Sequence, residues 1–429
     1  MTSCKLAGPG VLTGTVHPPG DKSISHRALM ISALAEGESS YSRFLEAADC
    51  LHTMTALQAL GVDIKNTPGT GLVTVRGVGM NGLKAPEKEL YLGNSGTSMR
   101  LLLGVLAGQR FECQLTGDES LSTRPMRRVT QPLKQMGAQI KGSDQANYAP
   151  LTIRGGKLKG ISFDNHLASA QVKSAILFAG MYADGKTRVV EPVTSRDHTE
   201  RFLEAAGVDI LREAGWVEIG RVDRLTALGG AIPGDISSAA FFIAGAAVIV
   251  GSELTVKDVC LNPTRTGLLN VLRRMGAHIT TEITQEAPEP MGNIYVVGRR
   301  LKGTRIAKEE VPSLIDELPI LMTAMAAAEG ESLITGADEL RVKETDRIHS
   351  MSQNLNAIGG CVEELPDGCL IRGVSEFRPG KVDSFGDHRT AMSMAIASRL
   401  IKGELEITGT ACIGTSYPRF FKDFEDLQK

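Results

Sequence analysis

The sequence predicts a mixed α/β protein of two domains, assembled from six copies of one helix-and-strand unit. A glycine closes an Ala- and Leu-rich stretch six times, at positions 37, 108, 185, 251, 330 and 403. A second glycine signature, in LQALGVDI, LKQMGAQI, LEAAGVDI, LRRMGAHI and LNAIGGCV, alternates with the first. The chain of 429 residues exceeds the range in which one hydrophobic core keeps growing. Regular self-similarity is typical of a repeat architecture, so we expect three units in each domain.

The order of elements within a unit follows from local patterns. Stretches such as AAFFIAGAAVIVG are apolar nearly all round, which predicts helices buried inside their domains. Each stretch of the second signature is predicted to be a helix that ends at a left-handed glycine and is followed by a strand. Alternating runs such as LVTVRGV and LTIRGG predict further strands around the buried helices. The last stretch, FFKDFEDLQK, reads as the sixth copy of the second helix.

Two Pro-Gly clusters predict where the chain crosses between domains. They are Pro18-Pro19-Gly20 and Ile232-Pro233-Gly234, and such pairs mark turns and linkers. The expected domains are residues 1–19 with 233–429, and residues 20–232. The N-terminal strand would then belong with the C-terminal half.

Composition excludes several classes of function. The formal net charge of -2 argues against general nucleic-acid binding, which needs a basic surface, and 4% aromatic residues leave little for base stacking. Seven cysteines without paired metal-ligand spacing, and without a signal peptide, indicate a reducing cytoplasm. The longest apolar run, Ala239 to Val250, is too short to cross a bilayer, so no membrane role is expected.

Polar residues recur at the predicted starts of the buried helices. Lys22, Asn94, Gln171, Asp235, Asp316 and Arg389 lie 14 to 16 residues before the glycines of the first signature. Unpaired backbone N–H groups and the helix dipole favour an anion at such a start. In PPGDKSISHRALM, Lys22, Ser23 and Arg27 therefore suggest an anion site, although a capped helix with solvated charges is the alternative.

Other helix starts extend the candidate site. In GNSGTSMR, Gly93 and Gly96 would let a ligand approach the backbone, with Asn94 and Thr97 as polar lining, although a tight turn without a ligand is an equal alternative. The third repeat places Ser169, Ala170 and Gln171 at its helix start. The starts of the second helices and of the last buried helix add Arg124, Arg196, Lys343, Glu344, Arg347, Asp387, His388 and Arg389. These groups converge if the units pack around a common axis.

Two carboxylates suggest proton transfer. Asp316 is followed at once by the apolar run LPIL, and dry surroundings would shift its pKa, although an N-cap is the alternative. Glu344 follows Lys343, and a cap or a salt bridge is its alternative role. A basic cluster with two carboxylates fits acid–base chemistry on a phosphorylated substrate. Neither a Walker-type phosphate loop nor a His/Cys cluster for a catalytic metal occurs in the sequence.

Nine motifs in order carry a resemblance to a known family. GDKSISHR, GNSGTSMR, STRPM, SAQVKSA, SRDHTE, NPTRTG, IDELPIL, LRVKETDRI and GDHR resemble those of the enolpyruvyl transferases, specifically the 5-enolpyruvylshikimate-3-phosphate synthase family. The resemblance implies an inverse α/β prism of six βαβ-type units, three per domain, with an active-site cleft between the domains. It also implies transfer of the enolpyruvyl group of phosphoenolpyruvate to the 5-hydroxyl of shikimate 3-phosphate, in the route to chorismate and aromatic amino acids.

The resemblance assigns expected roles to the candidate residues. Contacts to shikimate 3-phosphate would come from Lys22, Ser23, Arg27, Ser169, Ala170, Gln171, Arg196, Asp316 and Lys343. Contacts to phosphoenolpyruvate would come from Lys22, Asn94, Gly96, Arg124, Gln171, Arg347 and Arg389. The resemblance implies an addition–elimination mechanism, in which Asp316 would accept the hydroxyl proton. Glu344 would transfer the proton at the methylene carbon of phosphoenolpyruvate, and Lys22 would stabilise the developing phosphate charge. No metal or organic cofactor is implied.

The family also sets expectations about state and inhibition. A monomer is expected, and binding of both anions should close the two domains because both contribute cations. Glyphosate is a possible inhibitor. Many members carry a lysine before the Phe-Pro or Tyr-Pro pair, whereas this chain reads IGTSYPRF, which resembles the divergent second class and leaves its inhibitor sensitivity open.

Two other functions remain open at the level of sequence. UDP-N-acetylglucosamine enolpyruvyl transferase shares the fold and the donor substrate, but it usually has a cysteine in the loop that reads GDESLSTRPM here, and an asparagine where this chain has Ser23. A catalytically inactive anion-binding module is the other alternative, although Asp316 and Glu344 are both present.

Overall fold

The glycines of the second signature end their helices as predicted. In the computed structural model, which describes residues 3–166 and 168–427, Gly61, Gly137, Gly207, Gly276 and Gly359 have φ between 90° and 115°. In the first signature, Gly108 differs from the other five, because its φ of -85° is right-handed and it caps its helix without the left-handed turn. Left-handed glycine therefore ends the five second helices, whereas the five left-handed glycines of the first signature lie several residues beyond the ends of their helices.

The chain divides into two compact units. Unit 1 comprises Met1–Pro19, Gly234–Glu286 and Pro290–Lys429, and unit 2 comprises Gly20–Pro233 and Ala287–Glu289. Two details differ from the expected boundaries, because Pro233 and the short segment 287–289 belong to unit 2. Gln428 and Lys429, at the end of the sixth predicted helix, lie outside the described residues.

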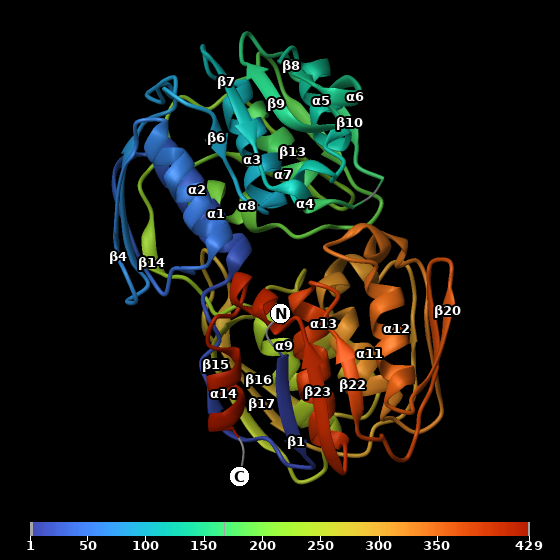
Figure 1. Ribbon diagram of the computed structural model, residues 1–429. Helices are drawn as coiled ribbons and strands as arrows, with labels where there is room; N and C mark the ends of the chain where they lie inside the picture. The colour runs from blue at the N-terminus through green and yellow to red at the C-terminus, as the bar shows by residue number, and fades with distance from the viewer. Residues whose placement is uncertain (1–2, 167, 428–429) are drawn as a thin grey trace. The chain divides into compact units, whose positions relative to one another are not determined.

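Each repeat of unit 2 forms a four-stranded sheet within the described residues (Figure 1). In every sheet one edge strand runs parallel to its neighbour, and the other pairings are antiparallel. The first sheet has the order β14 (Gly229–Ala231), β3 (Glu36–Ser42), β5 (Leu72–Val78) and β4 (Asp63–Thr67). The second has β6 (Leu90–Tyr91), β7 (Glu112–Thr116), β9 (Tyr148–Arg154) and β8 (Gln139–Gly142). The third has β10 (Ser162–Asp164), β11 (Thr187–Val190), β13 (Trp216–Ile219) and β12 (Ile210–Glu213).

The first helix of each repeat in unit 2 is buried as its composition predicts. These helices are α1 (Lys22–Leu34), α3 (Gly96–Ala107) and α7 (Ala170–Gly180). The backbones of α3 and α7 approach closely at Gly104, where an added Cβ would lie 2.2 Å from the carbonyl oxygen of Ala175. The remaining helices are α2 (Ala48–Ala59), α4 (Glu119–Ser122), α5 (Arg127–Met136), α6 (Ser143–Ala146) and α8 (His198–Ala205).

Unit 1 repeats the arrangement with strands from both ends of the chain. Its first sheet has the order β2 (Thr13–Val16), β15 (Glu253–Cys260), β17 (Met291–Val297) and β16 (His278–Gln285). The second has β18 (Arg305–Ile306), β19 (Glu331–Ile334), β21 (Gly368–Arg372) and β20 (Cys361–Leu365). The third has β1 (Ser3–Gly8), β23 (Gly403–Thr408) and β22 (Gly380–Asp383). Figure 1 shows the blue strand β1 beside the red strand β23, so the N-terminal strand completes the last repeat.

The buried helices of unit 1 pack against one another behind these sheets. They are α9 (Ile236–Val248), α11 (Leu318–Ala326) and α13 (His388–Ala397), and every residue of all three is buried. The outer helices are α10 (Gly267–Arg274), α12 (Arg347–Ala357) and α14 (Phe420–Asp426). Short 3-10 turns are η1 (Val311–Ser313), η2 (Ile315–Glu317), η3 (Asp338–Val342), η4 (Ser398–Leu400) and η5 (Thr410–Thr415).

Candidate functional site

The start of α1 carries two of the predicted cations of unit 2. Asp21 caps the helix by accepting a hydrogen bond from the backbone N–H of Ile24 at 2.9 Å. Lys22 Nζ lies 3.3 Å from Asp49 Oδ2, and both side chains keep about a fifth of their surface exposed. One turn on, Arg27 is buried, and burial lowers the pKa of its guanidinium to about 10. The helix start therefore combines a reachable ammonium with a buried guanidinium.

The start of α3 forms a second cationic position. Arg124 Nη2 donates to Asn94 Oδ1, and Arg124 Nη1 donates to the carbonyl of Asn94 at 3.3 Å. Asn94 in turn donates to Asp118 at 2.8 Å. A Cβ added to Gly96 would lie 3.0 Å from Arg100 Nη1 and 3.6 Å from Arg124 Nη1. The bare face of Gly96 is therefore turned towards two guanidinium groups, as an anion site requires.

The start of α7 is held in place from α3. Ser169 is its N-cap, Ala170 is its first residue, and Gln171 Oε1 accepts a hydrogen bond from Arg100 Nη1 at 2.6 Å. Gln171 Nε2 donates to Thr97 Oγ1 at 2.9 Å. Arg196, half-buried before α8, lies close enough to Arg27 to lower the pKa of that guanidinium further.

In unit 1, the guanidinium of Arg347 forms ion pairs with three carboxylates. Arg347, only 1% exposed at the start of α12, lies 3.5 Å from Asp316, 2.6 Å from Glu344 and 2.8 Å from Asp387. Burial alone would lower the pKa of Arg347, but Asp387, Glu344 and Asp316 hold it above the ordinary value. Burial alone would raise the pKa of the Asp387 carboxyl, but Arg347 and His388 together lower it below its ordinary value. Arg347 is thus charged, and it aligns both predicted proton-transfer groups.

Two more cations lie beside Asp316. Arg389 Nη1 donates to the carbonyl of Asp316 at 3.0 Å, and Arg389 Nε lies 3.8 Å from its carboxylate. Burial lowers the pKa of Lys343, while the charge of Asp316 opposes that change. Three carboxylates therefore face three cations in this cluster, which consists of Asp316, Lys343, Glu344, Arg347, Asp387 and Arg389.

The structure tests the cap and salt-bridge roles that the sequence left open for Asp316 and Glu344. Asp316 is not the N-cap of α11, because it lies in η2 and Glu317 occupies the capping position without a side-chain hydrogen bond. Glu344 does form the salt bridge that the sequence left open, and its side chain keeps 30% of its surface exposed. Both carboxylates remain reachable, since Asp316 is 19% exposed.

Sequence reasoning singled out most of these residues but gave no role to some important ones. Arg100, which holds Gln171, was given no role, and Asp387, which holds Arg347, was predicted only as a polar residue at a helix start. The NPTRTG motif supplies the buried Arg265, whose Nη2 donates to Asp235 at 3.2 Å and to Ser237 at 2.7 Å. For Arg100 and Asp387 the available signal is a charged residue in or beside a predicted buried helix, whereas Arg265 precedes the outer helix α10 and has no such signal.

The residues that the structure describes add no metal site, disulfide or membrane-spanning helix. Across residues 3–166 and 168–427, no group of His, Cys, Asp or Glu has an arrangement that could hold a metal ion. The seven cysteines are free thiols. Within the same described ranges, no helix is both long and apolar enough to span a membrane.

Comparison with known proteins identifies the family. A family model described as EPSP synthase (3-phosphoshikimate 1-carboxyvinyltransferase) matches residues 6–424. The chain belongs to the EPSP synthase family. The 3-phosphoshikimate 1-carboxyvinyltransferase of Alkalilimnicola ehrlichii is 51% identical over 413 residues, which cover 96% of this chain and 92% of that protein. The enzyme of that name from Bacillus cereus is 47% identical over 419 residues, covering 97% of each chain.

Solved structures agree with the EPSP synthase assignment. An EPSP synthase from Acinetobacter baumannii superimposes with a TM-score of 0.89 at 44% identity, covering 99% of this chain and 98% of that one. An enolpyruvyl transferase from Streptomyces tendae, at 16% identity and a TM-score of 0.79, shares the fold. The two-domain prism expected from the motifs is therefore confirmed as the fold.

Proposed function

We propose that this chain transfers the enolpyruvyl group of phosphoenolpyruvate to the 5-hydroxyl of shikimate 3-phosphate and releases inorganic phosphate, a step of the shikimate pathway. The observation that carries the proposal is the buried guanidinium of Arg347, which contacts both Asp316 and Glu344. An inactive anion-binding module has no need to align two reachable carboxylates. The family assignment supports the same reaction.

The reaction needs one proton acceptor and one proton donor. The 5-hydroxyl oxygen adds to C2 of phosphoenolpyruvate while C3 takes up a proton, which gives a tetrahedral intermediate. The bond from C2 to the phosphate oxygen then breaks, and C3 loses a proton, so that the double bond forms again. We assign Asp316 to the hydroxyl proton and Glu344 to the proton at C3, because each is a partly exposed carboxylate.

The cations of unit 2 are proposed to hold the two anions. Guanidinium groups match carboxylate and phosphate oxygens as a planar fork, which suits Arg124 for phosphoenolpyruvate and Arg196 for shikimate 3-phosphate. Lys22 would stabilise the phosphate charge that grows as the C–O bond breaks. The further contacts expected from the motifs belong to the same proposal. They are Ser23, Arg27, Asn94, Gly96, Ser169, Ala170, Gln171, Lys343, Arg347 and Arg389.

Three finer statements belong to the proposal as well. Glyphosate would compete with phosphoenolpyruvate beside Gly96, where the backbone faces two guanidinium groups. The chain would act as a monomer. Its seven free thiols fit the reducing cytoplasm, in which we propose that it works.

A comparison of acceptors tests the function. Purified chain is mixed with phosphoenolpyruvate and either shikimate 3-phosphate or UDP-N-acetylglucosamine, and the release of phosphate is followed. The proposal predicts rapid release of phosphate when shikimate 3-phosphate is the acceptor and none when the acceptor is UDP-N-acetylglucosamine. Release with the nucleotide sugar would support the other enolpyruvyl transferase, and release with neither acceptor would support an inactive module.

A further inference from the structure

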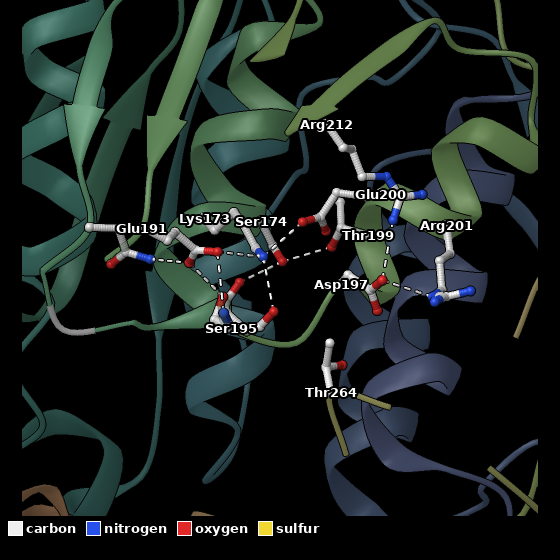
Figure 2. A network of polar contacts seen from close by, with 12 residues as sticks. Lys173, Ser174, Glu191, Ser195, Asp197, Thr199, Glu200, Arg201, Arg212 and Thr264 are labelled. Atoms are coloured by element: carbon white, nitrogen blue, oxygen red, sulfur yellow. Dashed lines mark hydrogen bonds and ion pairs between the residues drawn. The ribbon is translucent and has the colours of Figure 1, made fainter. Parts of the chain in front are cut away.

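A buried lysine lies behind the start of α7 without a role in the reaction described above. Lys173 is 1% exposed, and Figure 2 shows its ammonium between Glu191 and Glu200, with Ser195 beside them. Lys173 Nζ lies 2.9 Å from Glu191 Oε2 and 2.8 Å from Glu200 Oε1, and it donates to the carbonyl of Ser195 at 3.2 Å. Burial alone would lower the pKa of Lys173, but Glu200 and Glu191 raise it, so the lysine stays charged.

Glu191 is the centre of this cluster. Besides the ammonium of Lys173, its carboxylate accepts from Asn165 Nδ2 at 2.8 Å, from Ser195 Oγ at 2.6 Å and from the backbone N–H of Ser195 at 3.3 Å. Four donors therefore converge on one buried carboxylate. Ion pairs of this kind contribute little net stability, because desolvation offsets the attraction, but they fix geometry when fully hydrogen-bonded.

Both ends of the cluster reach segments that carry proposed substrate contacts. Asn165 Nδ2 donates to the carbonyl of Ser169 at 3.1 Å, and the N–H of Ser169 donates back to Asn165 Oδ1 at 3.4 Å. At the other end, Ser195 is the residue directly before Arg196. Gln171 is excluded from this linkage, because Arg100 and Thr97 on α3 hold its side chain.

We propose that these five residues, called the Lys173 clamp, are positioning residues for shikimate 3-phosphate. The clamp consists of Asn165, Lys173, Glu191, Ser195 and Glu200. It sets the segments of Ser169 and Arg196 at a fixed separation, so that both meet the acceptor without reorganisation. The inference rests on the proposed function. It predicts a selective effect on one substrate, since nothing in the clamp holds Gln171 or Arg124.

Two variants test the clamp while leaving its ion pairs intact. Ser195→Ala removes the 2.6 Å hydrogen bond to Glu191, and Asn165→Ala removes both links to Ser169. Ser195→Ala should raise the KM and the calorimetric Kd for shikimate 3-phosphate about five- to tenfold, the scale of one lost hydrogen bond. Asn165→Ala, which also removes its hydrogen bond to Glu191, should raise both at least as much. The KM for phosphoenolpyruvate and kcat should change less than about twofold. Lys186→Met is the control, because the Lys186–Glu218 pair lies in the same unit with Lys186 69% exposed.

The possible results distinguish failure of the Lys173 clamp from failure of the proposed enzymatic function. Wild-type turnover together with the selective loss supports the clamp. A fall in melting temperature with unchanged binding of shikimate 3-phosphate, or an equal rise in both KM values, would overturn it and leave only a structural role. Absence of wild-type turnover would instead refute the proposed function. If Asn165→Ala does not fold, Ser195→Ala alone decides, since it deletes one hydroxyl group.

Discussion

Replacing Asp316 by Asn should abolish most turnover while the protein stays folded. The amide keeps the shape of the side chain but cannot accept the hydroxyl proton, so kcat should fall about a hundredfold or more, a barrier increase of about 2.7 kcal/mol. The stability cost is much smaller. Arg347 keeps Glu344 at 2.6 Å and Asp387 at 2.8 Å, so it is not left as an unpaired buried charge.

The lost contacts of Asp316 set the expected stability change. Its carboxylate lies 3.5 Å from Arg347 and 3.8 Å from Arg389 and is 19% exposed, so losing both ion pairs should cost about 1 kcal/mol or less. Steady-state kinetics and thermal melting measure the two effects separately. Asp338→Asn, an exposed carboxylate of the same unit, is the matched control. Near-normal kcat in Asp316→Asn, or a loss of activity that only follows unfolding, would refute the role as proton acceptor.

Three further predictions address other parts of the molecule. Arg124→Lys keeps the charge but loses the planar fork, so the KM for phosphoenolpyruvate should rise far more than that for shikimate 3-phosphate; equal rises would place Arg124 outside the donor site. Gly96→Ala should fold, because its new Cβ at 3.0 Å meets the flexible end of Arg100, and it should raise the glyphosate inhibition constant by a larger factor than the phosphoenolpyruvate KM. Gly93→Ala is the matched contrast and should lower the melting temperature, since φ is 55° and the new Cβ would lie 2.3 Å from the ring of His52. If Gly96→Ala folds but raises the glyphosate inhibition constant and the phosphoenolpyruvate KM by the same factor, the proposed orientation of Gly96 is contradicted. Burial lowers the pKa of His26 from 6.5 to about 3. Between pH 6.5 and 3, His26 therefore takes up a proton in the unfolded chain but not in the folded chain. The free energy of unfolding should fall by about 1.4 kcal/mol per pH unit as the pH drops through this range. His26→Gln should flatten this acid dependence in urea titrations, and an unchanged slope would contradict the assignment.

The fold was accessible from sequence because its signals are local. Glycine stops and short polar caps act within one turn, and Asp21, Ser169 and Asp387 cap their helices at the expected starts. One part of the sheets was not accessible. The Pro-Gly clusters placed the N-terminal strand with the C-terminal half, where β1 pairs with β23, but no local signal showed that β14 joins β3, far earlier in the chain. The place of residues 287–289 in unit 2 has no local signature either.

The candidate site was likewise predictable from the sequence only in part. The residue types at the helix starts gave the set of cations, but the partners of those cations depend on contacts between distant segments. Arg347 and Asp387 are 40 residues apart, and Lys173 and Glu191 are 18 apart. A lysine inside the apolar stretch SAQVKSAILFAG resembles an exposed position on an otherwise buried helix. Only the tertiary structure shows that two glutamates surround it.

The central claim is the transfer of the enolpyruvyl group to shikimate 3-phosphate. Its most direct test is to incubate the purified chain with both substrates and to measure the organic product by mass spectrometry and the phosphate released in the same sample. The account predicts 5-enolpyruvylshikimate 3-phosphate and inorganic phosphate in equal amounts, and neither one when either substrate is omitted. Phosphate without the enolpyruvyl product, or no reaction under conditions where the chain is folded, would contradict it.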